Sequence, residues 1–253
     1  MKDYSLYPRS SISMSADKDF VKLLTEVIKK YKINAIVESG TFNGKGSTTT
    51  IADIIIKNNY PVDVFYTLEV DEKYFNEAVK NLKKFPFVKP IWGLSVNYEV
   101  ALAFIDSDTA INNHEMFPDV FIDTLINPKS FYTNEIKGQL SKNEADKFYF
   151  RDIFRKQPSK KLIFQTNALE PLLLKVSKNN ILVLLDSAGG IGYLEFQTVL
   201  NALKNNDYIL VLDDIHHLKH FRSLKHVQNS EHFELLKISE LDGWAIAFHK
   251  KEF

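Results

Sequence analysis

Acidic side chains follow two of the apolar runs in this sequence, at the point where each run ends. Asp186 closes the run ILVLLD, and Asp213 and Asp214 close the run YILVLDD. If these runs are parallel strands, the three carboxylates meet, because the carboxyl ends of parallel strands share one edge of a sheet. Buried carboxylates need partners, and a hard divalent ion such as Mg²⁺ is one that takes oxygen ligands. The sequence therefore predicts a metal site at these three residues; helix capping or pairing with Lys or Arg is the alternative.

Histidines come directly after the aspartate pair, at His216, His217 and His220. An imidazole near a reacting hydroxyl can act as a general base. We assign that role to His217 and place it with Asp213 in the catalytic part of the site; metal ligation or a position on a helix surface are the alternatives. Lys219, within the same stretch, is expected to be a solvated surface charge.

A glycine-rich turn, VESGTFNGKGST at 37–48, joins an apolar run to a helical segment. Its glycines, Gly40, Gly44 and Gly46, indicate that something comes close to the backbone there. The spacing fits neither a phosphate-binding loop of the Gly-Lys-Ser/Thr type nor the G-x-G-x-x-G fingerprint of dinucleotide sites. Glu38 is expected to face the place where a pyrophosphate would lie, and a carboxylate there repels phosphate and favours a cation.

S-adenosylmethionine (SAM) meets these conditions, because it carries positive charge and a ribose but no phosphate. The turn resembles the first motif of class I SAM-dependent methyltransferases, and is closest to the O-methyltransferase branches, where it commonly reads Glu-x-Gly-Thr-x-x-Gly-x-Ser-Thr. This chain has one extra residue before Ser47. The resemblance implies that Glu38, Gly40, Thr41 and Gly44 contact the cofactor.

The resemblance extends to the later strands. Glu69, at the end of VFYTLEV, occupies the family's acidic position, which binds both ribose hydroxyls. The stretch Trp92-Gly93-Leu94-Ser95 resembles the motif that lies against the adenine, which adds Ser95 to the cofactor residues, although Leu94 stands where the family has an acid. Metal-dependent members carry an Asp after the fourth strand and an acidic pair after the fifth. The resemblance thus implies that Asp186 serves both cofactor and metal, and that the ion holds the acceptor and lowers the pKa of its hydroxyl.

The elements that must position these residues alternate along the chain. Uninterrupted apolar runs predict buried parallel strands, and apolar residues at helical spacing predict the helices between them. We expect an α/β fold with a Rossmann-like, seven-stranded, mostly parallel sheet, helices on both faces and a C-terminal antiparallel hairpin. The predicted parallel strands cover 34–39, 64–70, 88–94, 181–186 and 208–214, and the hairpin strands lie in HFELLKIS and WAIAFHK.

Two segments fall outside this alternation. Residues 1–16 are polar and serine-rich, and we expect a flexible N-terminal arm before a single domain at 17–253. Residues 96–179 read as an insertion in that domain, with aromatic residues at Phe148, Tyr149 and Phe150 that suit a small helical cap, a pocket or a subunit contact. Within the insertion, DVFIDTLIN at 119–127 competes with 181–186 for the fourth strand; we prefer 181–186 because a helix and a fifth strand follow it directly.

The composition excludes several classes of function. Lys+Arg and Asp+Glu are equal at 32 each, so no overall field recruits nucleic acid or an anionic membrane. The chain has no cysteine, which excludes disulfides, thiolate nucleophiles and Cys-ligated zinc. It shows no signal peptide and no apolar run long enough to cross a bilayer, so we expect a cytoplasmic protein. Its expected partner is a small-molecule acceptor, and a homo-oligomer is left open.

These observations together predict a SAM-dependent methyltransferase. By the family resemblance, the reaction is O-methylation of a small hydroxylated metabolite or sugar, with assistance from a divalent ion such as Mg²⁺. Two alternatives remain: an NAD-dependent oxidoreductase on a similar sheet, and a non-catalytic binding protein that keeps the fold.

Overall fold

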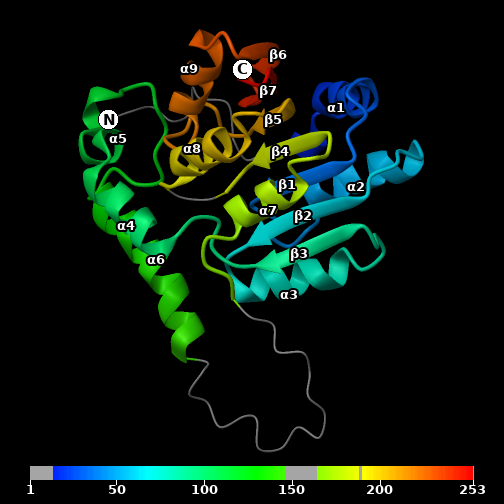
Figure 1. The fold of residues 1–253 in the computed structure, drawn as a ribbon. Helices are drawn as coiled ribbons and strands as arrows, with labels where there is room; N and C mark the ends of the chain where they lie inside the picture. Colours follow the sequence, from blue (N-terminus) through cyan, green and yellow to red (C-terminus); the bar gives the residue numbers. More distant parts are fainter. Residues whose placement is uncertain (1–13, 146–163, 188–189, 253) are drawn as a thin grey trace, which may run out of the picture.

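A seven-stranded sheet forms the centre of the protein. The computed structural model describes residues 14–145, 164–187 and 190–252 (Figure 1). The strand order is β3-β2-β1-β4-β5-β7-β6; the first five strands are parallel, and β7 runs antiparallel to both β5 and β6. The strands are β1 (Ala35–Ser39), β2 (Val64–Glu69), β3 (Val88–Trp92), β4 (Ile181–Leu185), β5 (Tyr208–Leu212), β6 (Phe233–Ser239) and β7 (Trp244–His249). The predicted Rossmann-like sheet and its terminal hairpin are confirmed.

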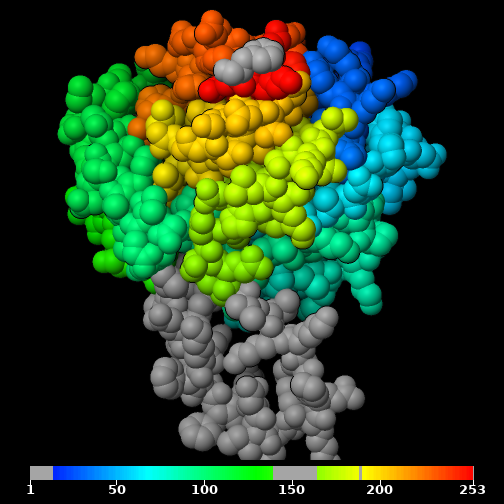
Figure 2. All heavy atoms as spheres, in the orientation of Figure 1, coloured from blue at the N-terminus to red at the C-terminus, as the bar shows by residue number. Residues whose placement is uncertain are grey.

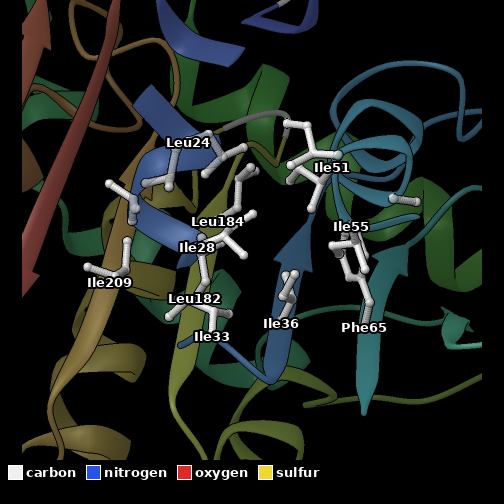
Figure 3. Close-up of a cluster of buried hydrophobic side chains, with 14 of the residues drawn as sticks. Leu24, Ile28, Ile33, Ile36, Ile51, Ile55, Phe65, Leu182, Leu184 and Ile209 are labelled. Atoms are coloured by element: carbon white, nitrogen blue, oxygen red, sulfur yellow. The ribbon is translucent and has the colours of Figure 1, made fainter. Parts of the chain in front are cut away.

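Helices cover both faces of this sheet. Because successive strand side chains point to opposite faces, Leu182 and Leu184 of β4 join one core and Ile181 and Val183 join the other. Figure 3 shows the first core, where Ile36, Leu182 and Leu184 meet helical side chains such as Leu24 and Ile51. The first face carries α1 (Lys18–Lys30), α2 (Ser47–Lys57) and α3 (Glu72–Asn81); the second carries α7 (Leu169–Val176), α8 (Gly192–Leu203) and α9 (Phe221–Asn229).

The predicted insertion is mainly helical. It contains α4 (Tyr98–Ser107), α5 (Thr109–Asn112), the short 3₁₀ helix η3 (His114–Met116) and α6 (Pro128–Ala145) before α7. Helices α4, α5 and α6 share a third core, which joins Ala101, Ile105 and Tyr132 to Leu94 beside β3. In the space-filling view they form one flank of the molecule, next to α8 and α9 (Figure 2). The insertion therefore forms a wall at one side of the sheet's carboxyl edge.

The competing segment 119–127 is not a strand of the sheet. It runs beside the loop that follows β5 and makes one isolated bridge, from Phe121 to His217. The preferred assignment, with 181–186 as the fourth strand, is confirmed by the pairing of β4 with β1 and β5. Residues 148–150 lie outside the described residues.

Most of the predicted N-terminal arm, residues 1–13, also lies outside the described residues. Its last turn is η2 (Met14–Ala16), and Met14 is buried in the first core. Asp17 then caps α1 by accepting the N–H of Asp19, and its other carboxylate oxygen accepts the indole N–H of Trp244, 2.7 Å away. The start of α1 is thereby tied to β7. Among the described residues, no helix combines the length and apolar character that crossing a membrane requires.

Candidate active site at the carboxyl edge of the sheet

A pocket of about 520 Å³ opens at the carboxyl edge of the sheet, where β1 lies beside β4. The chain continues from β1 to β2 on one side and returns to β4 on the other, so the pocket occupies the topological switch point at which open α/β sheets bind ligands. Side chains from α4 and α6 close one side of it. The strand-end residues in its lining are Ser39 at the end of β1 and Gly40 after it, Glu69–Asp71 at the end of β2, Gly93–Ser95 after β3, and Asp186 and Ser187 after β4.

The glycine turn packs closely against its neighbours. Gly40 has a φ of +93°, and a Cβ there would lie 2.2 Å from the carbonyl oxygen of Asp186. Gly44 has a φ of +76°, and its Cβ would lie 2.9 Å from the Leu82 side chain at the end of α3. The predicted close approach to the backbone is therefore made by the protein itself. Gly40 also lines the pocket, whereas Gly44 faces α3.

The structure places Glu38 beneath the turn and not in the pocket, contrary to the expectation that it faces a ligand. The side chain is fully buried, and its carboxylate accepts hydroxyl hydrogen bonds of 2.6 Å from each of Ser47, Thr48 and Thr67. Burial raises the pKa of Glu38 to about 7, against the effect of the three hydroxyls. Thr41 is also buried and shares a short hydrogen bond with Thr67. Glu38 and Thr41 thus join β1, β2 and the start of α2 from behind the site.

Glu69 lies where the sequence predicts, at the end of β2 and at the pocket wall. It is 9% exposed, and its Oε1 accepts the N–H of Asp71 at 2.8 Å. Burial raises its pKa to about 7. Next to it, Phe42 and Tyr74 form an aromatic pair with ring centroids 4.2 Å apart, and both line the pocket. This end of the pocket therefore offers a carboxylate beside aromatic surface, a combination that suits a ribose attached to a base.

The loop after β3 supplies the opposite wall at this end. Leu94 and Ser95 both line the pocket, and both are almost fully buried. A Cβ on Gly93 would lie 2.4 Å from the carbonyl oxygen of Gln165, so this glycine permits the contact between the β3 loop and the end of the insertion. Ser95 reaches the pocket as predicted. Leu94 gives apolar surface where the family has an acid.

The three aspartates of the predicted metal site do come together. Asp186, Asp213 and Asp214 each offer a carboxylate oxygen, and these oxygens lie within 4.8 Å of one another. Asp214 adopts a left-handed conformation with a φ of +50°, and its N–H donates to Asp213 Oδ1 at 2.9 Å. Burial and the two neighbouring carboxylates raise the pKa of Asp213 well above its ordinary value. Asp186 is the member of this group that lines the pocket.

Lys219 already provides a cation to this group. Its side chain is 6% exposed, and its Nζ lies 2.8 Å from Asp214 Oδ2 and 3.3 Å from Asp186 Oδ1. Burial alone would lower the pKa of Lys219, but the charges of Asp186, Asp214 and Asp213 outweigh burial and raise it. The expectation of a solvated surface lysine is wrong. A divalent ion bound to the same oxygens would lie against a buried ammonium, so these residues do not fit the ion that the sequence assigns to them.

His217 lies behind the pocket wall. Its Nδ1 accepts the backbone N–H of Lys219 at 3.2 Å, and its Nε2 lies 3.5 Å from Asp123 Oδ2. The same Asp123 oxygen accepts the hydroxyl hydrogen of Tyr132 at 2.8 Å, and Tyr132 lines the pocket. With both ring nitrogens engaged, His217 reaches the pocket through Asp123 and Tyr132, and it is placed to position them.

Glu195 of α8 is a pocket residue that the sequence does not reveal. It is fully buried, and its Oε2 accepts the hydroxyls of Ser39 at 3.0 Å and Ser187 at 2.6 Å. Its Oε1 is buried and has no hydrogen-bond partner among the described residues. Burial raises the pKa of Glu195. A buried carboxylate oxygen that has no protein donor and belongs to a pocket residue can accept a hydrogen bond from a ligand.

Sequence reasoning missed Lys219, Glu195 and Tyr132 because each stands in a stretch that reads as helix surface or insertion. One signal could have found the first of them. Gly192 opens α8, and a Cβ there would lie 2.5 Å from Lys219 Cβ. A glycine at the start of an otherwise well-formed helix indicates that another chain segment crosses it closely.

The charges around the pocket are unequal. Its described lining includes one ammonium, that of Lys219, which is already paired with aspartates. The same lining carries five carboxyl groups, those of Glu69, Asp71, Glu135, Asp186 and Glu195. Apolar side chains such as Leu68, Val70 and Leu94 make up much of the remaining wall. Such a pocket favours a ligand with hydrogen-bond donors and apolar surface, and gives a diphosphate no unpaired cation among the described lining residues.

No family model matches the sequence, and no curated protein matches it. Solved structures match the fold at low identity. An O-methyltransferase from Bacillus cereus in complex with S-adenosylhomocysteine (SAH) is similar with a TM-score of 0.45 and 11% identity, over 92% of this chain and 82% of that one. The cofactor-bound Rv0187 from MTB gives a TM-score of 0.48 and 13% identity, over 99% of this chain and 86% of that one.

A third solved structure is the O-methyltransferase TomG from Streptomyces achromogenes, involved in tomaymycin synthesis and in complex with SAM. Its TM-score is 0.43 and its identity 12%, over 92% of this chain and 81% of that one. All three scores lie below 0.5, so the assignment of the fold rests on the strand order and register of this chain, and its function rests on the pocket.

Proposed function

We propose that this protein is a SAM-dependent methyltransferase that methylates an oxygen of a small hydroxylated acceptor. The observation that carries the proposal is the pocket at the switch point, with its excess of carboxylates over cations and its aromatic and apolar walls. SAM is a phosphate-free adenosine derivative with a sulfonium and an ammonium group. A dinucleotide cofactor would bring a diphosphate into a pocket whose described lining offers it no unpaired cation, which argues against the NAD-dependent alternative.

The residues present fit this cofactor. Glu69 has lone pairs for the two ribose hydroxyls, beside Phe42 and Tyr74, which offer aromatic surface for the base. Glu195 has a buried Oε1 without a partner, which suits the ammonium group of the amino-acid portion. Asp186 also lines the pocket, but its carboxylate is already paired with Lys219.

The acceptor's place is the side formed by the insertion. Ile105, Tyr132, Glu135 and Ile136 line the pocket there and give it a mostly apolar wall with two polar groups. Partial burial and the charge of Asp123 raise the pKa of Glu135 to about 7. A carboxylate with such a pKa can take a hydroxyl proton near neutral pH. We therefore give the role of base to Glu135, and His217 becomes a positioning residue.

The chemistry then requires little more than orientation. SAM supplies a methyl group on a positively charged sulfur, which leaves as a neutral thioether. The acceptor oxygen would form the new C–O bond with its lone pair as the S–C bond breaks, and Glu135, which lines the pocket, would take its proton. The walls exclude water and hold the two reactants in line, which is where most of the rate enhancement arises in such displacements. No step is routed through a divalent ion, because Lys219 already lies among the aspartates.

Thermal-shift measurements test this proposal. We expect SAM and SAH to raise the melting temperature of the wild-type protein, and NAD to leave it unchanged. Glu69→Gln should reduce the shift given by SAM and SAH, whereas Glu231→Gln, at a glutamate whose side chain is 90% exposed, should not. Stabilisation by NAD alone would favour the oxidoreductase. No stabilisation by any of the three would favour a non-catalytic protein.

A further inference from the structure

We infer that the ammonium of Lys219 takes the place of a divalent ion in the three-aspartate cluster, and that it offers a hydrogen bond to the acceptor oxygen. The first part concerns the protein alone. The second part, the contact with the acceptor, rests on the proposed function. Together they mean that the site binds its acceptor without a metal ion, although its three carboxylates could otherwise ligate one.

The distances support the replacement. The Lys219 Nζ lies 2.8 Å from Asp214 Oδ2 and 3.3 Å from Asp186 Oδ1, which are hydrogen-bonding distances for an ammonium. Mg²⁺ would need oxygens at about 2.1 Å, within the same space. The two cations therefore exclude each other, sterically and by charge.

The protein is built to hold the lysine in this position. A Cβ on Gly192 would lie 2.5 Å from Lys219 Cβ and 3.0 Å from its carbonyl oxygen, so glycine at the start of α8 leaves room for the lysine backbone and stem. On the other side, the Lys219 N–H donates to His217 Nδ1 at 3.2 Å, and the neighbouring Leu218 N–H donates to the Phe121 carbonyl at 2.8 Å. These contacts fix the backbone on both sides and hold the Lys219 Cβ beside the cluster, and the two ion pairs then hold the ammonium.

One N–H group of the Lys219 ammonium is not used by the two aspartates. It carries three N–H groups, and Asp214 and Asp186 accept two of them. Lys219 lines the pocket, as do Tyr132 and Glu135 on the acceptor side. The third N–H is therefore available to an oxygen bound in the pocket. An ammonium that donates a hydrogen bond to the acceptor oxygen stabilises the partial negative charge that develops on this oxygen as its proton leaves.

Manganese binding tests the replacement without any assay of activity. Titration of the metal-free protein with Mn²⁺, followed by electron paramagnetic resonance, should show no site in the wild type at micromolar metal. Lys219→Met removes the ammonium and keeps the stem, so it should gain one site and a rise in melting temperature with Mn²⁺. Lys129→Met is the matched control, because it breaks the exposed ion pair with Asp106 and should gain nothing.

Two results would overturn the replacement. The first is one micromolar Mn²⁺ site in the wild type that Asp213→Asn abolishes, a measurement that stands even if Lys219→Met fails to fold. The second is a folded Lys219→Met that gains no site.

The acceptor contact needs a separate measurement. Once turnover is observed, Lys219→Met should raise the KM for the acceptor at least tenfold and leave the Kd for SAH within threefold, and chelation of metal should leave wild-type turnover unchanged. An unchanged KM for the acceptor would show that Lys219 does not contact the acceptor. If SAH fails to bind the wild type while the Mn²⁺ results are as expected, the proposed function is wrong, but the replacement of the divalent ion by Lys219 is still supported.

Discussion

Two fully buried glutamates near the carboxyl edge of the sheet differ in their hydrogen bonds and in their position relative to the pocket. Glu38 has both carboxylate oxygens hydrogen-bonded to hydroxyls, and it lies outside the pocket. Glu195 has hydroxyls on one oxygen alone, and it lines the pocket. The carboxylate of Glu38 stabilises the fold, and the carboxylate of Glu195 is held in place with one oxygen that has no partner among the described residues. For these two acids, the difference in role follows from the oxygen left without a donor at the pocket and not from the charge of the carboxylate.

The largest effect should come from removing the structural glutamate. Glu38→Ala leaves the hydroxyls of Ser47, Thr48 and Thr67 without their acceptor and opens a cavity, so we expect the free energy of unfolding to fall by roughly 3–5 kcal/mol. Urea denaturation measures it. Glu195→Ala removes a carboxylate that already has one buried oxygen without a partner, so it should cost less stability. A greater loss from Glu195→Ala would reverse the comparison.

The next effect concerns the free oxygen of Glu195. Glu195→Gln keeps the size of the side chain and removes its charge, so SAH should bind at least tenfold more weakly, a loss of about 1.4 kcal/mol or more. 5′-Methylthioadenosine lacks the amino-acid portion, and its affinity should stay the same. Calorimetry with both ligands makes the comparison. Equal weakening of both would mean that Glu195 acts on the shape of the pocket and not on the ammonium.

A change at the ribose end should affect both ligands alike. Glu69→Gln replaces one acceptor of the diol by an amide, and we expect about a tenfold loss of affinity for SAH and for 5′-methylthioadenosine. Together with Glu195→Gln, this variant divides the pocket into a ribose end and an ammonium end. A loss confined to SAH would show that Glu69 does not contact the ribose.

The smallest effect is a dependence of stability on pH. Burial raises the pKa of Glu38 from its ordinary 4.5 to about 7, so between these values the folded protein binds more protons than the unfolded chain. Stability contributed by this group must then fall as pH rises from about 4.5 to about 7, on the order of 1 kcal/mol between pH 6 and pH 7. Denaturation of the wild type and Glu38→Gln across this range isolates the slope. Parallel curves for the two proteins would contradict it.

The fold could be read from the sequence because its signals are local. The central strands β4 and β5 are uninterrupted apolar runs, such as ILVLL at 181–185, and each is followed by an acid. Asp17 and Asp71 stand at the starts of helices, where both accept backbone N–H groups. Glu69 and the aspartate cluster followed from the same pattern, because strand ends meet at one edge.

The partners of these groups could not be read in the same way, because they depend on distant packing. Lys219 stands in the polar stretch HHLKHF, and nothing nearby shows that Asp186 and Asp214 surround it. Glu195 lies within YLEFQ on an amphipathic helix, where an acid normally faces solvent. The position of Glu38 in the motif predicts contact with the ligand. In the structure, both of its carboxylate oxygens instead accept hydrogen bonds from hydroxyls of α2 and β2.

Isothermal titration calorimetry with SAM tests the central claim, that the pocket takes a cationic, phosphate-free adenosine compound. The wild-type protein should release or absorb measurable heat with SAM at a stoichiometry of one, with no change when EDTA is present, and NAD should give none and should not displace SAM. Tight binding of NAD together with no heat from SAM or SAH would contradict the account.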